Sequence, residues 1–211
     1  MTATQNKTVC LDMEGVLVPE LWPQLAKKTG LKEFSITTRD VPDYAALMNT
    51  RINLLRTHRI TLKQVQALLV DVDIFPGARR FVEELKRSMN VVLVSDAFAE
   101  MITPFHEKLG QPQLLCNHFS CDSEGFVTQP NYIRHHGKHE AVEKIQALGD
   151  WVVAVGDAYN DLSMLRAADL GFLFRPSTVV KLIASDIYAA ENYDEILLAI
   201  PKVAPQINTS Y

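Results

Sequence analysis

Four short apolar runs recur along the chain, and each has the length of a strand buried on both faces of a sheet. They lie at residues 8–12, 90–96, 151–157 and 170–174. Amphipathic helical patterns stand between the later runs, at residues 77–89 and 138–149. Because strands that alternate with helices form parallel sheets, the pattern predicts an α/β fold built on a parallel sheet.

The stretch between the first and second runs is too long for a single crossover helix. Its helical patterns at 43–58 and 61–70 have apolar residues along one face, and Thr61 and Gln64 have the spacing of a capping box. An inserted helical cap is the simplest interpretation. We therefore expect a core domain of residues 1–17 and 76–211 and a cap domain of residues 18–75.

Two further segments interrupt the regular alternation. Residues 114–133 contain two strand-like runs around the turn residues 122–125, which predicts a β-hairpin on the core domain. Residues 97–109 have a helical pattern that contains Pro104. Proline lacks the N–H that a helix interior requires, so we expect this helix to be kinked or split.

Composition places limits on the partners. The chain has 211 residues, of which 47% are hydrophobic and 22% charged, enough for one buried domain with an insertion. Its net charge of −4 offers no basic surface for nucleic acid. No apolar stretch approaches the roughly 20 residues that span a bilayer, and the polar start does not resemble a signal peptide. We expect a cytoplasmic protein with neither nucleic-acid nor membrane partners, and a homodimer is left open.

Acidic residues close three of the predicted strands, as Asp12, Asp96 and Asp157. The carboxyl ends of parallel strands meet at one edge of a sheet, so these acids are expected to converge. Glu14 stands two residues after Asp12, and Asp161 one helical turn after Asp157. Converging carboxylates require a hard cation, and Mg²⁺ binds carboxylates together with phosphate oxygens. The pattern predicts a magnesium site.

Groups that could hold a phosphate lie near the same strand ends. Ser95 precedes Asp96 at the end of the second strand, and Lys138 begins a predicted helix. A hydroxyl and an ammonium group bind phosphate oxygens by hydrogen bonding and by charge. Carboxylates, a divalent cation and phosphate-binding groups together indicate phosphoryl transfer.

The order of these motifs resembles the haloacid dehalogenase superfamily, whose core is a Rossmann-like parallel sheet. The resemblance is carried by DMEG at 12–15, VLVSD at 92–96, Lys138 and GDAYND at 156–161. Glu20, Arg51 and the GDAYND loop are similar to the phosphoserine phosphatase group, and most closely to its bacterial branch with homoserine phosphotransferase activity. That branch, like this chain, has Glu14 where most of these phosphatases have a second Asp.

The resemblance implies a role for each motif residue. Asp12 would be the nucleophile that forms an aspartyl-phosphate, and Glu14 the general acid and base. Asp12, the main-chain carbonyl of Glu14, Asp157 and Asp161 would form the Mg²⁺ site, with Asp161 acting through a water.

Other residues would bind the substrate. Ser95, Lys138 and Asn160 would hold the phosphoryl group, and Asp96 joins these candidates by its position. Asp96 replaces the usual Gly, and we expect it to cap the next helix. Glu20 and Arg51 would bind the ammonium and carboxylate groups of phosphoserine, because a guanidinium pairs bidentately with a carboxylate. As isolated helix charges, both could equally be solvated surface residues.

The function that follows is Mg²⁺-dependent hydrolysis of O-phosphoserine, with transfer of the phosphoryl group to homoserine as a further activity. A phosphatase for another small phosphorylated metabolite is the first alternative. A phospho-receiver module, which also gathers acids, Mg²⁺ and a lysine, is a second alternative of a different class. The cap-sized insertion and the GDAYND loop argue against a receiver.

Overall fold

The computed structural model describes residues 5–38, 40–41 and 43–203, the last three without their side chains. The chain forms two compact units. Unit 1 contains the residues up to Asp12, 76–92 and those from His136 onward, and unit 2 contains 13–75 and 93–135. The chain passes between the units at 12/13, 75/76, 92/93 and 135/136. The core and cap domains expected from the sequence have other boundaries and remain a prediction.

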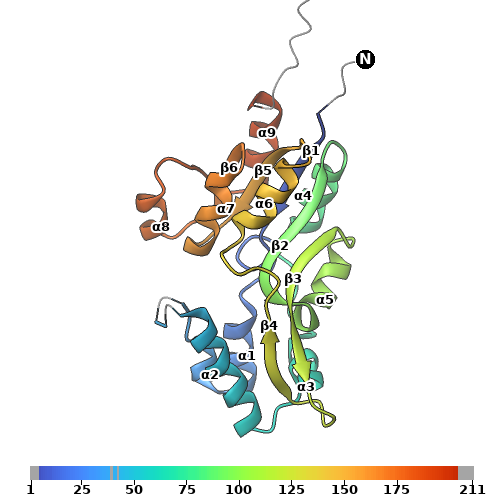
Figure 1. Ribbon diagram of the computed structural model, residues 1–211, viewed down its shortest axis with the longest axis vertical. Coiled ribbons are helices and arrows are strands. Elements are labelled where there is room, and N and C mark those ends of the chain that lie inside the picture. Colours follow the sequence, from blue (N-terminus) through green and yellow to red (C-terminus); the bar gives the residue numbers. More distant parts are fainter. Residues whose placement is uncertain (1–4, 39, 42, 204–211) are drawn as a thin grey trace, which may run out of the picture. The chain divides into compact units, whose positions relative to one another are not determined.

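Unit 1 is built on parallel strands (Figure 1). They are hydrogen-bonded in the order β1 (Lys7–Leu11), β5 (Trp151–Gly156), β6 (Leu170–Phe174) and β7 (Tyr188–Ala190). The register pairs Leu11 with Val155, so β1 and β5 end side by side. Strands β1, β5 and β6 are nearly continuous apolar runs, as the sequence predicts for strands covered on both faces. The predicted α/β fold with a parallel sheet is confirmed.

The helices of unit 1 pack apolar faces into its core. They are α4 (Ala78–Lys86), α6 (His139–Gln146), α7 (Leu162–Ala167), α8 (Thr178–Ile183) and α9 (Tyr193–Val203). Phe81 of α4 stacks on Tyr193 of α9 with a ring-centroid distance of 4.6 Å. Tyr193 also stacks on Phe174 of β6 at 4.7 Å. These rings join the helices to the strands by burial of apolar surface.

Unit 2 combines helices with a hairpin. Its helices are α1 (Leu21–Thr29), the 3₁₀ turn η1 (Lys32–Ser35), α2 (Tyr44–Thr57), α3 (Leu62–Leu69) and α5 (Ala99–Lys108). Its strands follow the order β4 (Val127–Asn131), β3 (Gln113–Cys121) and β2 (Asn90–Phe98), of which β2 begins in unit 1. The antiparallel pairing of β3 and β4 confirms the predicted hairpin, although it lies in unit 2 with the helices of residues 18–75 and not with the parallel strands of unit 1. Thr61 and Gln64 form the predicted capping box at α3.

Pro104 does not split α5, which runs from Ala99 to Lys108. A proline at this position cannot donate to the carbonyl of Glu100, four residues earlier. That carbonyl instead accepts a hydrogen bond from Nε2 of Gln66, at 2.8 Å. The side chain from α3 thus satisfies the acceptor that the proline leaves, and the helix continues through Pro104; the alternative expectation of a kink stays a prediction.

Among the described residues, no helix is both long enough and apolar enough to span a membrane.

Candidate functional site

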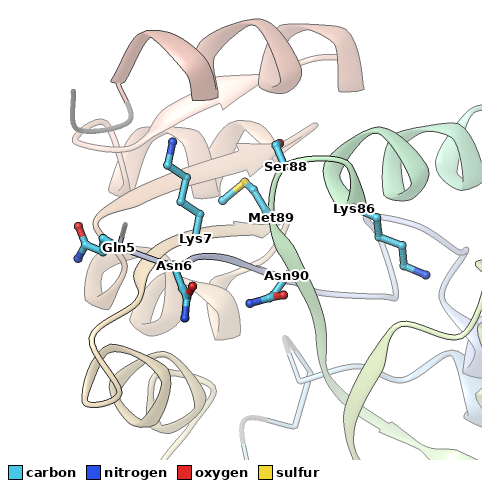
Figure 2. Close-up of a pocket in the computed structure, with 7 residues that line it drawn as sticks. All are labelled: Gln5, Asn6, Lys7, Lys86, Ser88, Met89 and Asn90. Atoms are coloured by element: carbon cyan, nitrogen blue, oxygen red, sulfur yellow. The ribbon is translucent and has the colours of Figure 1, made fainter. Parts of the chain in front are cut away.

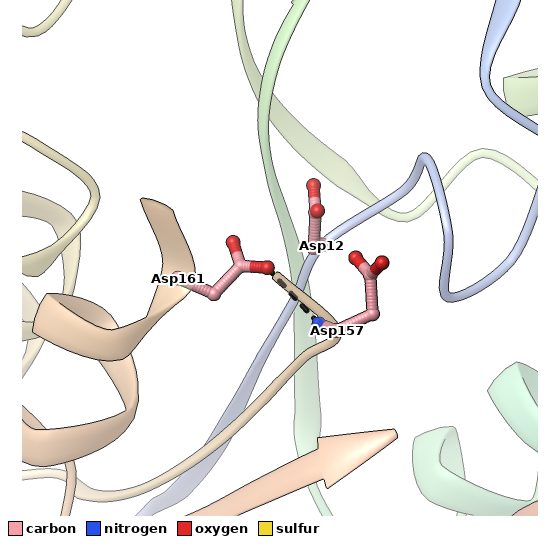
Figure 3. Close-up of side chains that lie close together, drawn as sticks. All are labelled: Asp12, Asp157 and Asp161. Atoms are coloured by element: carbon pink, nitrogen blue, oxygen red, sulfur yellow. Dashed lines mark hydrogen bonds between the residues drawn. The ribbon is translucent and has the colours of Figure 1, made fainter. Parts of the chain in front are cut away.

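Three carboxylates meet at the carboxyl ends of β1 and β5 (Figure 3). Asp12 follows β1 and Asp157 follows β5, and the Asp12 N–H donates to the carbonyl of Val155 at 2.9 Å. Asp12, Asp157 and Asp161 each contribute an oxygen, and these oxygens lie within 4.8 Å of one another. Parallel pairing of the two strands therefore brings together the acids that the sequence placed at strand ends.

Asp161 is oriented by the turn that carries it. The 3₁₀ turn η2 (Tyr159–Asp161) folds its side chain back toward β5, and the side chain is 0% exposed. Its Oδ2 accepts hydrogen bonds from the N–H groups of Asp157 at 3.0 Å and Ala158 at 3.1 Å. A Cβ on Gly156 would lie 2.4 Å from Cβ of Asp161, so only glycine leaves room for this arrangement.

Lys138 supplies positive charge to the cluster. Its side chain is 1% exposed, and its Nζ lies 2.7 Å from Oδ1 of Asp12 and 2.7 Å from Oδ1 of Asp161. Lys138 is the N-cap residue immediately before α6, so the start of this helix fixes its position. A buried ammonium group requires such carboxylate partners.

The cluster retains an excess of negative charge. Burial raises the pKa of Asp12 well above its usual value, and the charges of Asp161 and Asp157 raise it further. Lys138 opposes this shift in pKa but does not cancel it. Three carboxylates facing one ammonium group fit a divalent cation, because oxygen ligands suit Mg²⁺ and its charge would balance theirs.

In unit 2, the segment after Asp12 is a tight turn. The N–H groups of Leu17 and Val18 both donate to the carbonyl of Met13, and Gly15 has a φ of 81°. The half-buried Glu14 points its Oε1 at the N–H of Leu21, 2.7 Å away at the start of α1. Its carboxylate therefore lies at a helix N-terminus, which favours negative charge.

Arg51 is a buried residue of α2, with only 6% of its surface exposed. Its Nη2 donates to the carbonyl of Ile36 at 2.8 Å, and its guanidinium lies 4.6 Å from the centre of the Trp22 ring. Its buried Nε has no hydrogen-bond partner. Burial lowers the pKa of Arg51, while Tyr44, Glu14 and Glu20 raise it.

Glu20 and Asn160 are both exposed. Glu20 stands at the N-terminus of α1, and Asn160 lies in η2 beside Asp161. The negative charge of Glu20 raises the pKa of Arg51, which lies in the same unit. Asn160 belongs to the same unit as the acidic cluster.

Ser95 and Asp96 lie near the end of β2 in unit 2. The buried Ser95 accepts a hydrogen bond at Oγ from the N–H of Ala97, at 3.1 Å. The expected capping role of Asp96 is wrong, because β2 continues past it and the N-cap of α5 is Phe98, without a side-chain cap. Its carboxylate instead forms an ion pair with Arg134, with 3.1 Å between Oδ1 and Nη2.

Residues 6–169 match the family of haloacid dehalogenase-like hydrolases. The chain belongs to this family. A phosphoserine phosphatase of Pseudomonas syringae pv. tomato is 39% identical over 173 residues, which cover 82% of this chain and 73% of the relative. The phosphoserine phosphatase ThrH of Pseudomonas aeruginosa is also 39% identical, over 82% of this chain and 84% of its own.

Solved structures agree with this assignment at the level of the fold. A phosphoserine phosphatase in its apo form has a TM-score of 0.75 at 25% identity, covering 94% of this chain and 99% of the other. A phospho-aspartyl intermediate analogue of phosphoserine phosphatase has a TM-score of 0.76 at 23% identity, covering 92% and 99%. The fold of this haloacid dehalogenase-like hydrolase therefore extends over nearly the whole chain.

A polar concavity of about 380 Å³ lies elsewhere in unit 1 of this hydrolase (Figure 2). It is lined by Gln5, Asn6, Lys7, Lys86, Ser88, Met89 and Asn90. Lys7 begins β1, whereas Asp12 follows its last residue, so this concavity is at the opposite end of the strand. It has no carboxylate in its lining and takes no part in the acidic cluster.

The structure gives Gly156 and Arg134 contacts that the sequence did not predict. Gly156 stands inside the GDAYND motif, but its contact with Asp161 depends on the folding of η2. Arg134 lies in a histidine-rich segment of polar residues, where nothing in the local pattern indicates its long-range contact with Asp96. The glycine is recognisable by its motif, and the arginine only by the structure.

We expect Gly156→Ala to displace the Asp161 carboxylate and to weaken binding of Mg²⁺ by about tenfold or more, because the new methyl group would overlap Asp161. Isothermal titration with Mg²⁺ measures the affinity. Gly149→Ala is the control for a destabilising glycine substitution away from the cluster, since its φ of 93° strains an alanine while a Cβ there meets nothing within 4 Å. Unchanged Mg²⁺ affinity in Gly156→Ala would contradict the account of this turn.

Proposed function

We propose that this protein hydrolyses O-phosphoserine, with Mg²⁺ as cofactor and an aspartyl-phosphate at Asp12 as intermediate. The observation that carries the proposal is the group of three carboxylates at the strand ends of a haloacid dehalogenase-like hydrolase, of which the two buried ones, Asp12 and Asp161, pair with the Lys138 ammonium. Membership in a hydrolase family supports an enzyme over a phospho-receiver module. The relatives named phosphoserine phosphatase support the substrate.

Asp12, Asp157, Asp161 and the main-chain carbonyl of Glu14 would hold the Mg²⁺ ion. Bound there, Mg²⁺ would neutralise charge on the phosphate oxygens and lower their repulsion of an attacking carboxylate. The protein contributes the geometry, since Gly156 and η2 hold Asp161 and the β1/β5 pairing holds Asp12 beside Asp157.

The reaction would proceed in two displacements at phosphorus. An oxygen of Asp12 attacks the phosphorus, and the ester bond to the serine oxygen breaks as Glu14 gives a proton to that oxygen. Glu14 then takes a proton from water, which attacks the phosphorus and releases phosphate and the free Asp12 carboxylate. The hydrogen bond from the Leu21 N–H to Oε1 would keep the Glu14 carboxyl group in one place through both proton transfers.

The phosphoryl oxygens would be held by Ser95, Lys138 and Asn160. Lys138 contributes an ammonium group whose position is fixed by two ion pairs, and Ser95 a buried hydroxyl. Asp96 joins this group only through its place beside Ser95, because its carboxylate would repel a phosphate and is engaged by Arg134.

The amino acid part of the substrate would be bound by Arg51 and Glu20. A buried guanidinium whose Nε lacks a partner is suited to a carboxylate, which could accept from Nε and a terminal nitrogen together. Glu20 would pair with the substrate's ammonium group. A phosphatase for another small phosphorylated metabolite is the alternative. A cytoplasmic location and a homodimer remain predictions from the sequence.

Asp12→Asn should abolish release of phosphate from phosphoserine, because an amide is too poor a nucleophile to attack phosphorus. Asp186→Asn is the control, since Asp186 forms an exposed ion pair with Arg166. Thermal melting shows whether both variants fold. Activity of Asp12→Asn within tenfold of wild type would remove Asp12 from this role.

Arg51→Ala should lower kcat/KM for phosphoserine by an amount equivalent to about 2–5 kcal/mol, since it removes a charge-assisted bidentate contact. Turnover of p-nitrophenyl phosphate, which has no carboxylate, should fall much less. Arg56→Ala is the matched control, because Arg56 lies on the same helix with its side chain 46% exposed. An equal loss with both substrates would contradict the assignment of Arg51.

Homoserine would accept the phosphoryl group from Asp12, because it carries the same ammonium and carboxylate groups as serine on a chain one methylene longer. When phosphoserine and homoserine are supplied together, we expect phosphohomoserine to form alongside phosphate, as water and the bound alcohol compete for the intermediate. Mass spectrometry of the mixture detects both products. Phosphate as sole product at saturating homoserine would show that the protein only hydrolyses.

A further inference from the structure

Arg134 is a buried arginine that reaches from the segment after β4 to the end of β2. Its side chain is 6% exposed. Its Nη2 donates to the carbonyl of Ser95 at 2.5 Å and to Oδ1 of Asp96 at 3.1 Å. Its Nη1 donates to the carbonyl of Leu115 on β3 at 3.2 Å. One guanidinium thus connects two consecutive residues of β2 with the neighbouring strand.

The same end of β2 receives two further hydrogen bonds from unit 2. The carbonyl of Asp96 accepts from the Tyr44 hydroxyl at 2.8 Å and from Nδ2 of Asn117 at 2.8 Å. Side chains from α2, β3 and the segment after β4 therefore all bind the main chain of Ser95 and Asp96. Such a set of donors leaves this main chain little freedom to move.

The charge of Arg134 explains why an acid stands beside Ser95. A guanidinium removed from water is costly unless a negative group compensates it. The Asp96 carboxylate supplies that charge, whereas a glycine at this position would leave Arg134 with main-chain oxygens alone. Asp96 and Arg134 thus act together: the carboxylate stabilises the buried guanidinium, and the guanidinium donates hydrogen bonds to the main chain.

We propose that Arg134 is a positioning residue that acts on the phosphoryl group through Ser95. Because Oγ of Ser95 uses a lone pair to accept from the N–H of Ala97, its O–H remains available to donate to a phosphate oxygen. Arg134 holds the main chain from which that hydroxyl projects, and Asp96 keeps Arg134 in place. The inference rests on the proposed function, in which Ser95 binds the phosphoryl group.

Arg134→Gln tests this role against Arg56→Gln. Arg56 is a matched control because it also joins a carboxylate, Asp122, to a main-chain oxygen, that of Val127, but belongs to no proposed site. In the presence of Mg²⁺, we expect Arg134→Gln to lower kcat/KM by about 10- to 100-fold. Inhibition by inorganic phosphate should weaken by a similar factor, while inhibition by L-serine stays within about twofold. Arg56→Gln should change none of these values.

Two outcomes would overturn the inference. Arg134→Gln could behave like Arg56→Gln, which would show that Ser95 needs no support. It could instead weaken inhibition by phosphate and by L-serine equally, which would indicate general structural damage.

The claim that Asp96 keeps Arg134 in place is tested by a double-mutant cycle of the two residues. If the two residues act as a pair, adding Asp96→Gly to Arg134→Gln should cause little further loss, and additive losses would contradict the pairing.

Running each assay with p-nitrophenyl phosphate as well separates this inference from the substrate assignment. Wild-type turnover of p-nitrophenyl phosphate without turnover of phosphoserine would refute phosphoserine as substrate, yet the Arg134 comparison would still be decided. Normal hydrolysis of phosphoserine by Arg134→Gln would refute the inference and leave the proposed function intact. Direct titration of inorganic phosphate gives the same comparison without turnover.

Discussion

The ion pairs of Lys138 with Asp12 and Asp161 are the interaction on which the candidate site depends. Parallel pairing of β1 with β5 forces carboxylates together, and their repulsion in a buried place would oppose folding. One ammonium at 2.7 Å from two of them offsets part of that cost. The remaining negative charge makes the cluster suited to a divalent cation and then to a phosphate. The same imbalance thus links the packing of unit 1 to its proposed chemistry.

In unit 2 the buried charges are positive, because the side chains of two arginines, Arg51 and Arg134, are removed from water. Arg134 has the carboxylate of Asp96 and two main-chain oxygens, so its charge is balanced within the protein. Arg51 donates to the carbonyl of Ile36 and to the sulfur of Met48 and lies over the face of Trp22, but no ion pair joins it to a carboxylate in the described part of the chain. The Nε atoms of both arginines lack a hydrogen-bond partner, so the difference between them is the carboxylate. A balanced guanidinium is suited to hold structure, whereas a less fully paired one is suited to bind an anionic ligand. This contrast supports a positioning role for Arg134 and a substrate-binding role for Arg51.

Local patterns predicted most of the fold, because the burial of a strand or a helix face determines the spacing of apolar residues along the chain. They predicted the longer parallel strands, the hairpin and the capping box, and they placed acids at the strand ends that the structure brings together. Strand β7 was missed because three residues show no periodicity, and helices α1, α7, α8 and α9 were not predicted either. The uninterrupted helix at Pro104 depends on Gln66, and the ion pair of Asp96 depends on Arg134. Neither could be predicted, because both partners are distant in sequence. Contacts between segments far apart in sequence leave no local signal.

The central claim is that the phosphoryl group passes through Asp12. The most direct test is to quench the enzyme with acid within milliseconds of mixing it with phosphoserine and Mg²⁺, and to map phosphorylation by peptide mass spectrometry. The account predicts a phosphoryl group on Asp12 that is removed by hydroxylamine, as acyl phosphates are, and that does not form in Asp12→Asn. A phosphoryl group on another residue, or phosphate release without labelling of Asp12 under conditions that trap acyl phosphates, would contradict it.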